Sequence, residues 1–175
     1  MRKTLIAFME DRPGVLNRVA SMIRRRNFNV VSLAVAPTET PAISRMTVVL
    51  ECDASQEEQV GKQLRKLVNV TKVITDLSSD NAIFRELALI KVNATPTTRS
   101  EIIHLAEVFR AQVVDVSSAT LTIEITGTED KLDSFIELIR PFGLKEMART
   151  GPVAMLRGVA SEQRPSGENT EAAHV

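Results

Sequence analysis

Hydrophobic positions along the first half of the chain predict six elements, four strands and two helices. Residues 4–9 are apolar almost throughout, which is typical of a short strand buried on both faces. After a turn-like break, apolar residues recur from Val15 to Ile23 with the spacing of one helix face. The same reasoning gives the order βαββαβ, with strands at 4–9, 30–36, 44–51 and 70–77 and helices at 15–26 and 54–67. The second helix is expected to carry Val60, Leu64, Leu67 and Val68 on one side.

The polar, turn-forming stretch 78–81 interrupts this pattern, and the same order then returns. Strands are predicted at 85–92, 111–116, 121–126 and 143–149, and helices at 99–110 and from 127–128 onward. The chain is therefore predicted to be an α+β protein with two tandem ferredoxin-like βαββαβ domains. We expect the first domain at 1–78, a linker at 79–82, the second domain at 83–158 and a disordered, polar tail at 159–175.

Charge and composition narrow the classes of function. Lys and Arg together number 22, as do Asp and Glu, and this balance argues against phosphate binding, which normally leaves a basic surplus. Aromatic residues make up 3% of the chain, which leaves few platforms for stacking bases. No apolar run approaches the roughly 20 residues of a membrane span, and no signal-peptide pattern is visible. We therefore expect a cytoplasmic protein that binds neither nucleic acid nor membranes.

Candidate catalytic and metal-binding residues are few. His104 falls within a predicted helix and His174 in the tail, and no HxxxH or CxxC spacing exists, so no metal site is predicted. Cys52 ends the apolar face of a strand, which favours a buried inert thiol over a nucleophile. The charges at 56–58 favour a solvated helix face, and Arg24–Arg26 favour a helix-capping cluster over a phosphate site. We therefore predict no catalytic residue in this chain.

The most informative segment is the loop between the first strand and the first helix. Pro13 presets the backbone for a helix start, and Gly14 lets another backbone or a ligand come close. Amide groups at the helix N-terminus can receive a carboxylate, while Asp11 can accept from an ammonium group. With neighbouring apolar side chains, this chemistry suits a free amino acid. The alternative is an ordinary Asp-x-Pro-Gly turn in which Asp11 only caps the helix.

Within this architecture, residues 11–18 (Asp-Arg-Pro-Gly-Val-Leu-Asn-Arg) resemble the ligand loop of an ACT domain, a small-molecule sensor module of amino-acid metabolism. The first domain is accordingly expected to be an ACT domain. Further segments extend the likeness at 29–38, 44–47, 63–68, 109–116, 127–128, 131–133 and 149–151. Together they resemble the small regulatory subunits of acetolactate (acetohydroxyacid) synthase, from Met1 to about Gly158.

This resemblance implies a regulatory subunit without catalytic residues of its own. In the family, the catalytic large subunit carries thiamine diphosphate, Mg²⁺ and FAD, and the small subunit carries none of these cofactors. The small subunit raises the activity of its partner and confers feedback inhibition by valine in branched-chain amino-acid biosynthesis. Family ACT domains pair side by side as homodimers, with the effector at their interface. By position, the effector-binding residues here are Asp11, Arg12, Pro13, Gly14, Val15, Leu16, Asn29 and Val30.

The resemblance leaves several points open. In relatives the position of Asp11 is often Asn, and the extra charge here bears on affinity and on whether valine or a related branched-chain amino acid binds best. The second domain is expected to support dimerisation and contact with the catalytic subunit. An alternative function is a free-standing amino-acid sensor that controls another partner or transcription, although no helix-turn-helix or basic arm is visible. An enzyme in its own right is disfavoured by the missing acid, base, metal and phosphate motifs.

Overall fold

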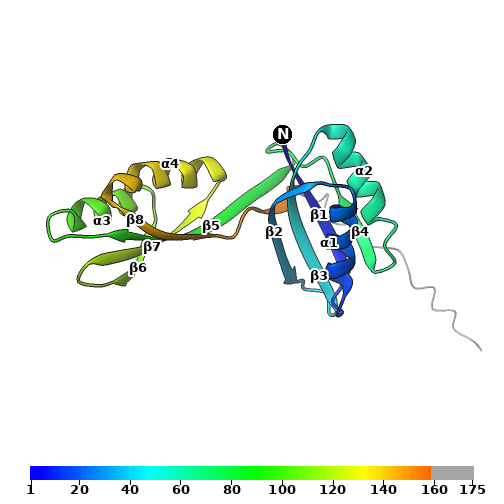
Figure 1. The fold of residues 1–175 in the computed structure, drawn as a ribbon, viewed down its shortest axis with the longest axis horizontal. Coiled ribbons are helices and arrows are strands. Elements are labelled where there is room, and N and C mark those ends of the chain that lie inside the picture. Colours follow the sequence, from blue (N-terminus) through cyan, green and yellow to red (C-terminus); the bar gives the residue numbers. More distant parts are fainter. Residues whose placement is uncertain (159–175) are drawn as a thin grey trace, which may run out of the picture.

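The computed structural model of the protein describes residues 1–158. Its first unit is an antiparallel sheet with the strand order β2-β3-β1-β4, and two helices cover one face of this sheet (Figure 1). The elements are β1 (Arg2–Glu10), α1 (Val15–Arg25), β2 (Asn29–Pro37), β3 (Ile43–Glu51), α2 (Ala54–Leu64) and β4 (Val70–Ile74). This is the predicted βαββαβ order, and the apolar first strand lies in the middle of the sheet.

The second unit repeats this arrangement, with the strand order β6-β7-β5-β8. Its elements are β5 (Ala82–Asn93), α3 (Arg99–Val108), β6 (Gln112–Val116), β7 (Thr120–Gly127), α4 (Glu129–Ile139), the 3₁₀ turn η1 (Arg140–Phe142), β8 (Leu144–Arg149) and β9 (Val153–Leu156). Two tandem ferredoxin-like units are therefore confirmed, whereas β9 was not predicted. The predicted linker 79–82 falls between β4 and β5, with Ala82 already in β5, and the predicted tail at 159–175 lies outside the described residues.

Each unit has its own apolar core between sheet and helices. The first core consists of Leu5, Ala7, Met9, Val15, Val19, Ile23, Met46, Val48, Leu50, Cys52, Val60, Leu64, Val70 and Val73. In the second core the rings of Phe109 and Phe135 pack with their centroids 5.3 Å apart.

The expectation that Val68 shares the buried side of the second helix is wrong. Val68 is 93% exposed, because α2 ends at Leu64 and the chain beyond it no longer follows the helical repeat.

Strand β5 holds the two units together. Its even-numbered residues Ala88, Ile90 and Val92 are buried in the core beneath the helices of the second unit. At its start β5 pairs with β9, and this ribbon lies against the open face of the first sheet (Figure 1). Ala82 and Ala154 are buried there, and the guanidinium of Arg45 in β3 donates to the carbonyl of Ala154. One strand thus belongs to both units.

The charges at 56–58 of α2 were predicted to lie on a solvated face, and this is only partly correct. Glu57 is only 4% exposed, and its carboxylate lies 3.1 Å from the ammonium of Lys3 in β1. The same carboxylate accepts from the amide of Asp76 at 2.9 Å, and its hydrogen bond to Lys3 raises the pKa of the lysine. Glu58 is exposed and pairs with Lys62 at 2.7 Å, as a surface helix residue does. The sequence pattern misses Glu57 because its partners come from distant segments.

Cys52 and His104 occupy the environments that the sequence predicts. Cys52 is 4% exposed directly after β3, and burial raises the pKa of its thiol. His104 is exposed on α3, where its imidazole lies 3.9 Å from the carboxylate of Glu107. Residues 1–158 contain no group of His, Cys, Asp or Glu side chains placed to hold a metal ion. Among the helices of these residues, none has the length and hydrophobicity to cross a membrane.

The buried Glu57 carboxylate is predicted to contribute to stability. Glu57→Gln should lower the free energy of unfolding by about 2 kcal/mol, because Lys3 then loses a charge-assisted hydrogen bond in a mostly buried site. Urea unfolding at pH 7 measures the difference. Glu58→Gln is the matched control, since its exposed carboxylate should leave the unfolding midpoint unchanged. Equal effects of the two substitutions would contradict the assignment.

The burial of Cys52 predicts a slow reaction with thiol reagents. In the folded protein Cys52 should react at least about tenfold more slowly than in urea, because reaction requires an exposed thiolate. Absorbance with an aromatic disulfide reagent follows the rate. Ser55→Cys in a Cys52→Ala background places a thiol at an exposed position of α2 and should react quickly. Rapid modification of native Cys52 would show that this part of the core opens readily.

Candidate functional site

The loop from Asp11 to Gly14 connects β1 to α1 and is tied to the neighbouring turn. The amide of Asp11 donates to the carbonyl of Ala42 at 2.8 Å, and the amide of Arg12 donates to that of Glu10 at 3.0 Å. Gly14 has a φ of 85°, a left-handed conformation that favours glycine, and it is the residue that precedes the helix. A Cβ at Gly14 would meet nothing within 4 Å, so the space in front of the helix is open.

Side chains anchor the base of this loop to the start of β4. Asn69 donates through Nδ2 to the Glu10 carboxylate at 2.7 Å, and its carbonyl oxygen accepts from Arg18 of α1 at 2.6 Å. Arg12 lies 3.6 Å from the same Glu10 carboxylate. These contacts join β1, α1 and the residue before β4, so the loop is held from both sides.

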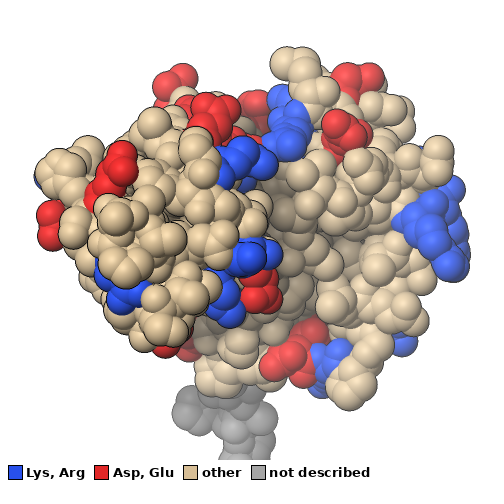
Figure 2. Space-filling model, turned by 60° about the vertical axis from the view of Figure 1, so that its left-hand side comes forward, with Lys and Arg blue, Asp and Glu red and all other residues tan. Residues whose placement is uncertain are grey.

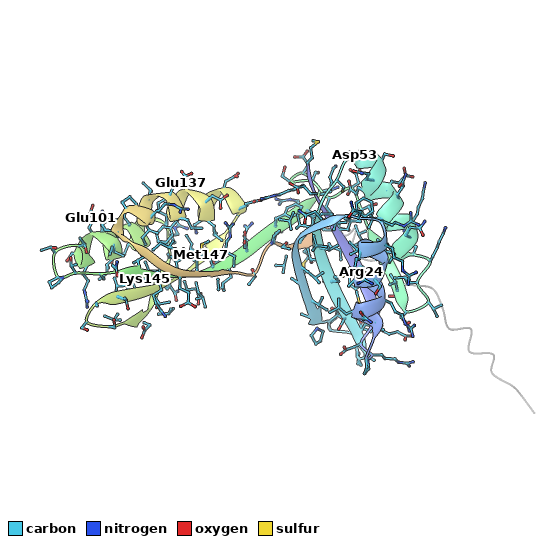
Figure 3. All side chains as sticks on the ribbon, in the orientation of Figure 1. Arg24, Asp53, Glu101, Glu137, Lys145 and Met147 are labelled. Carbon is cyan, nitrogen blue, oxygen red and sulfur yellow. The ribbon has the colours of Figure 1, made fainter. Side chains whose placement is uncertain are left out.

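The start of α1 carries donors that no side chain satisfies. No side chain caps this helix, so the alternative in which Asp11 is only an N-cap is wrong. Within residues 1–158 the amides of Leu16 and Asn17 have no backbone acceptor, and the Asp11 carboxylate is exposed without a partner. By contrast, α2 has a full capping box, in which Asp53 accepts from the Gln56 amide at 2.8 Å (Asp53 is labelled in Figure 3). The open N-terminus of α1 is therefore a place where an anion is favoured.

An apolar groove runs beside the loop, between α1 and β2. It encloses about 180 Å³ and is lined by Leu16, Val19, Ala20, Ile23, Arg24, Phe28, Val30 and Leu33. Leu16, Val30 and Leu33 remain exposed to solvent along it, each at just over 40%. Arg24, labelled in Figure 3, belongs to the last turn of α1 at the far end of the groove from Leu16. The groove has a floor and one wall, but its outer side is open.

Strand β2 forms the outer edge of the first sheet. It pairs with β3 on one side only, within the part of the chain that the structure describes. Four of its apolar side chains, Val30, Val31, Leu33 and Val35, are about 40% exposed. A free edge that presents apolar residues is a template for pairing with another chain, and monomeric proteins usually protect such edges.

The predicted effector residues fall into two separate groups. Asp11, Arg12, Pro13, Gly14 and Leu16 lie together and exposed at one end of α1, whereas Val15 points into the core. Asn29 and Val30 lie at the opposite end of the sheet, where the Asn29 amide donates to Glu51 at 2.9 Å. The register places Asn29 level with Arg2 and the loop level with Glu10, about 26 Å away along β1. Leu16 and Val30 line the same groove, but within one chain Asn29 and the Asp11–Gly14 loop do not come to one ligand.

Comparison with known proteins identifies the family. Residues 5–72 match a family described as the AHAS small subunit-like ACT domain, and residues 85–158 match one described as the small subunit of acetolactate synthase. The chain belongs to the acetolactate synthase small-subunit family. The acetolactate synthase small subunit of Mycolicibacterium smegmatis is 50% identical over 155 residues, which cover 89% of this chain and 91% of that protein.

Other members of the small-subunit family match almost the whole chain. The acetolactate synthase small subunit of Bacillus subtilis is 42% identical over 171 residues, with 97% of this chain and 98% of that protein covered. The crystal structure of the acetolactate synthase small subunit from Thermotoga maritima superposes with a TM-score of 0.84 at 40% identity. It covers 90% of this chain and 98% of the Thermotoga chain.

Most residues of the groove lie outside the set predicted from the sequence. Val19, Ala20, Ile23, Phe28 and Leu33 line it but were not among the predicted effector residues. A signal for this surface exists in β2, where Val30–Ala36 is apolar at six of seven positions. An edge strand with one solvated face normally alternates between apolar and polar residues. This nearly continuous apolar run departs from that alternation and marks β2 as part of an apolar surface.

Proposed function

We propose that this chain is the regulatory subunit of acetolactate synthase and that it binds its thiamine-dependent catalytic subunit. In this proposal the chain raises the activity of the catalytic subunit and confers feedback inhibition by valine. Thiamine diphosphate, Mg²⁺ and FAD belong to the catalytic partner, and the assembly is cytoplasmic. Membership of the small-subunit family supports the partnership. The uncapped start of α1 beside an open apolar groove is the observation that supports an amino-acid effector.

The effector site is completed by a homodimer of the first domains. The free edge of β2 and its exposed apolar residues favour pairing with β2 of a second copy. Around a twofold axis the two strands run antiparallel, so the start of one lies opposite the end of the other. Pro37 ends β2 opposite Ser44, next to the residue that pairs with Glu10. Asn29 of the second copy thus comes to the end of the sheet that carries the Asp11–Gly14 loop.

A valine molecule finds complementary chemistry in this shared site. Its carboxylate accepts from the amides of Leu16 and Asn17, aided by the positive end of the α1 dipole. Its ammonium group donates to the Asp11 carboxylate and to the side-chain carbonyl of Asn29 from the second copy. Its isopropyl group enters the groove beside Leu16 and Leu33, where burial of a valine-sized side chain contributes roughly 1.5–3 kcal/mol.

Inhibition follows if valine binds one state of the holoenzyme better than the other. The ratio of its affinities for the two states sets the limit of inhibition. Couplings between sites are typically about 1–3 kcal/mol, which gives a graded reduction of activity rather than complete arrest. Because each site contains residues of two copies, a change in how the two sheets meet is the structural change that valine selects.

The proposed dimer predicts a shift in oligomeric state when β2 becomes charged. Leu33→Glu should convert the dimer into monomers, because two carboxylates would then lie at an apolar interface. Sedimentation velocity at micromolar concentration measures the change. Val114→Glu is the matched control on β6, the edge strand of the second sheet, where Val114 is 50% exposed. A Leu33→Glu protein that stays dimeric would exclude β2 as the interface.

The proposed effector loop predicts a separation of inhibition from activation. Gly14→Asp should abolish valine inhibition while the variant still stimulates the catalytic subunit, because the new carboxylate repels that of valine in the space before α1. Acetolactate formation with and without valine measures both properties. Gly158→Asp is the control, since Gly158 also has a positive φ of 64° and open space around its Cα. Unchanged inhibition in Gly14→Asp would mean that the loop is only a turn.

The regulatory role itself is tested with the unmodified chain. The isolated protein should form no acetolactate, but it should stimulate the catalytic subunit in a saturable manner and make it sensitive to valine. Titration of the small subunit into a fixed amount of catalytic subunit gives both effects. Absence of stimulation across the whole titration would overturn the proposed function.

A further inference from the structure

The turn between β8 and β9 crosses directly over β2. Gly151 lies in this turn with a φ of 70°, and it stands against Ser32 of β2. A Cβ at Gly151 would lie 2.4 Å from Cβ and 2.6 Å from Oγ of Ser32, closer than real Cβ atoms approach their neighbours. Only glycine therefore allows the second unit to contact β2 at this distance.

Ser32 makes this contact by shape and not by hydrogen bonding. Its Oγ is buried and has no hydrogen-bond partner among the described residues. The register of β2 against β3 shifts between Val30 and Ser32, which leaves Val31 as a bulge next to the contact. Val30 and Asn29, two and three residues earlier, belong to the proposed effector site. A displacement of this end of β2 would therefore press Ser32 against Gly151.

The turn is fixed to the second unit by several polar contacts. The Thr150 amide donates to the carbonyl of Leu87 at 3.0 Å, and the Thr150 hydroxyl accepts from the Leu87 amide at 3.1 Å. The guanidinium of Arg149 donates to both carboxylate oxygens of Glu86 at 2.8 Å and to Asp133 of α4 at 2.6 Å. The turn cannot follow β2 without moving β5 and α4 as well.

Beside this contact lies a cleft between the two units, whereas the β5–β9 ribbon packs on the open face of the first sheet. The cleft, of about 740 Å³, is lined by residues of both units, including Ser32, Thr128 and Gly151, and Figure 2 shows the recess between the two lobes. Its rim is bridged by an ion pair of Arg2 with Glu129, and Arg45 reaches the Ala154 carbonyl. Ser32 and Gly151 both line this cleft, and their close packing is the contact between β2 and the β8–β9 turn at its edge.

We propose that Ser32 and Gly151 are positioning residues that couple the effector strand β2 to the second domain. The inference rests on the proposed function, because it names how the β2 site communicates with the remainder of the chain. Effector binding moves β2 at Asn29 and Val30, and the steric contact passes this movement to the β8–β9 turn. The second domain then changes its position relative to the first. A tightly packed contact transmits such a shift because neither backbone has room to absorb it.

Gly151→Ala tests the contact, with Gly158→Ala as its matched control. Both glycines have a positive φ, so both substitutions carry similar backbone strain, but among residues 1–158 a Cβ at Gly158 meets nothing within 4 Å. Gly151→Ala should weaken valine binding to the isolated subunit at least about fivefold, the lower end of the range for couplings between sites, and should raise the valine concentration for half-inhibition of the holoenzyme. Stimulation of the catalytic subunit at saturation should persist, and Gly158→Ala should match the wild type.

A second substitution distinguishes the contact from simple strain. Ser32→Gly removes the two clashing atoms and leaves the Ser32 Cα at 3.8 Å, an ordinary contact. The double variant Ser32→Gly/Gly151→Ala should therefore return to within twofold of Ser32→Gly alone in valine affinity. Thermal unfolding checks that each variant is folded. Full wild-type affinity in Gly151→Ala, or a loss that Ser32→Gly does not restore, would overturn the proposal.

Hydrogen exchange gives a readout that is independent of valine. In Gly151→Ala the amides of residues 31–34 should exchange faster than in Gly158→Ala, because the added methyl group displaces β2. If the wild type neither binds valine nor confers inhibition, the proposed effector fails. Unchanged exchange at residues 31–34 would instead contradict only the proposed coupling through Ser32 and Gly151, and it would leave the proposed effector untouched.

Discussion

The burial of one face of β5 by two different partners is the constraint on which the arrangement of this protein depends. The middle of the strand is covered by the helices of the second unit, whereas its start lies with β9 on the open face of the first sheet. The two units share no common core, yet neither can turn freely, because both hold the same strand. The same constraint brings the β8–β9 turn over β2, since β9 must return to pair with the start of β5.

The first unit is open at its β2 edge, within the part of the chain that the structure describes. α1 has no side-chain cap, although the chain builds a full capping box at α2 with Asp53 and Gln56. The adjacent groove has no outer wall, and the strand beside it exposes apolar residues. An isolated domain gains nothing from unsatisfied amides beside exposed apolar groups. A second copy and a zwitterionic ligand satisfy both, which is why we propose them together.

Local periodicity predicted most of the fold. The predictions failed where contacts between distant segments decide the structure. Helical spacing and strand alternation depend on neighbouring residues, so both βαββαβ units could be predicted. β9 was missed because its four residues form a strand only by pairing with β5, about 70 positions earlier. The burial of Glu57 in α2 was not predicted because its partner Lys3 lies in β1, far away along the chain. The loop at Asp11–Gly14 could be found from its motif, but the groove depends on how α1 meets β2.

The separation of Asp11 from Asn29 along β1 decides what kind of sensor this architecture can be. If both lay at one end of a single sheet, ligand affinity would not depend on a second copy. Because they lie at opposite ends, an effector that contacts both must bridge two chains. In the proposed dimer, binding depends on the way the two first domains meet, and the ligand favours the assembly that closes the groove. In the proposed coupling, a signal that originates between two chains reaches each second domain by a route that includes β2. At Ser32 and Gly151 this route is narrowest, since there the two backbones are separated by no more than the side chain of one serine.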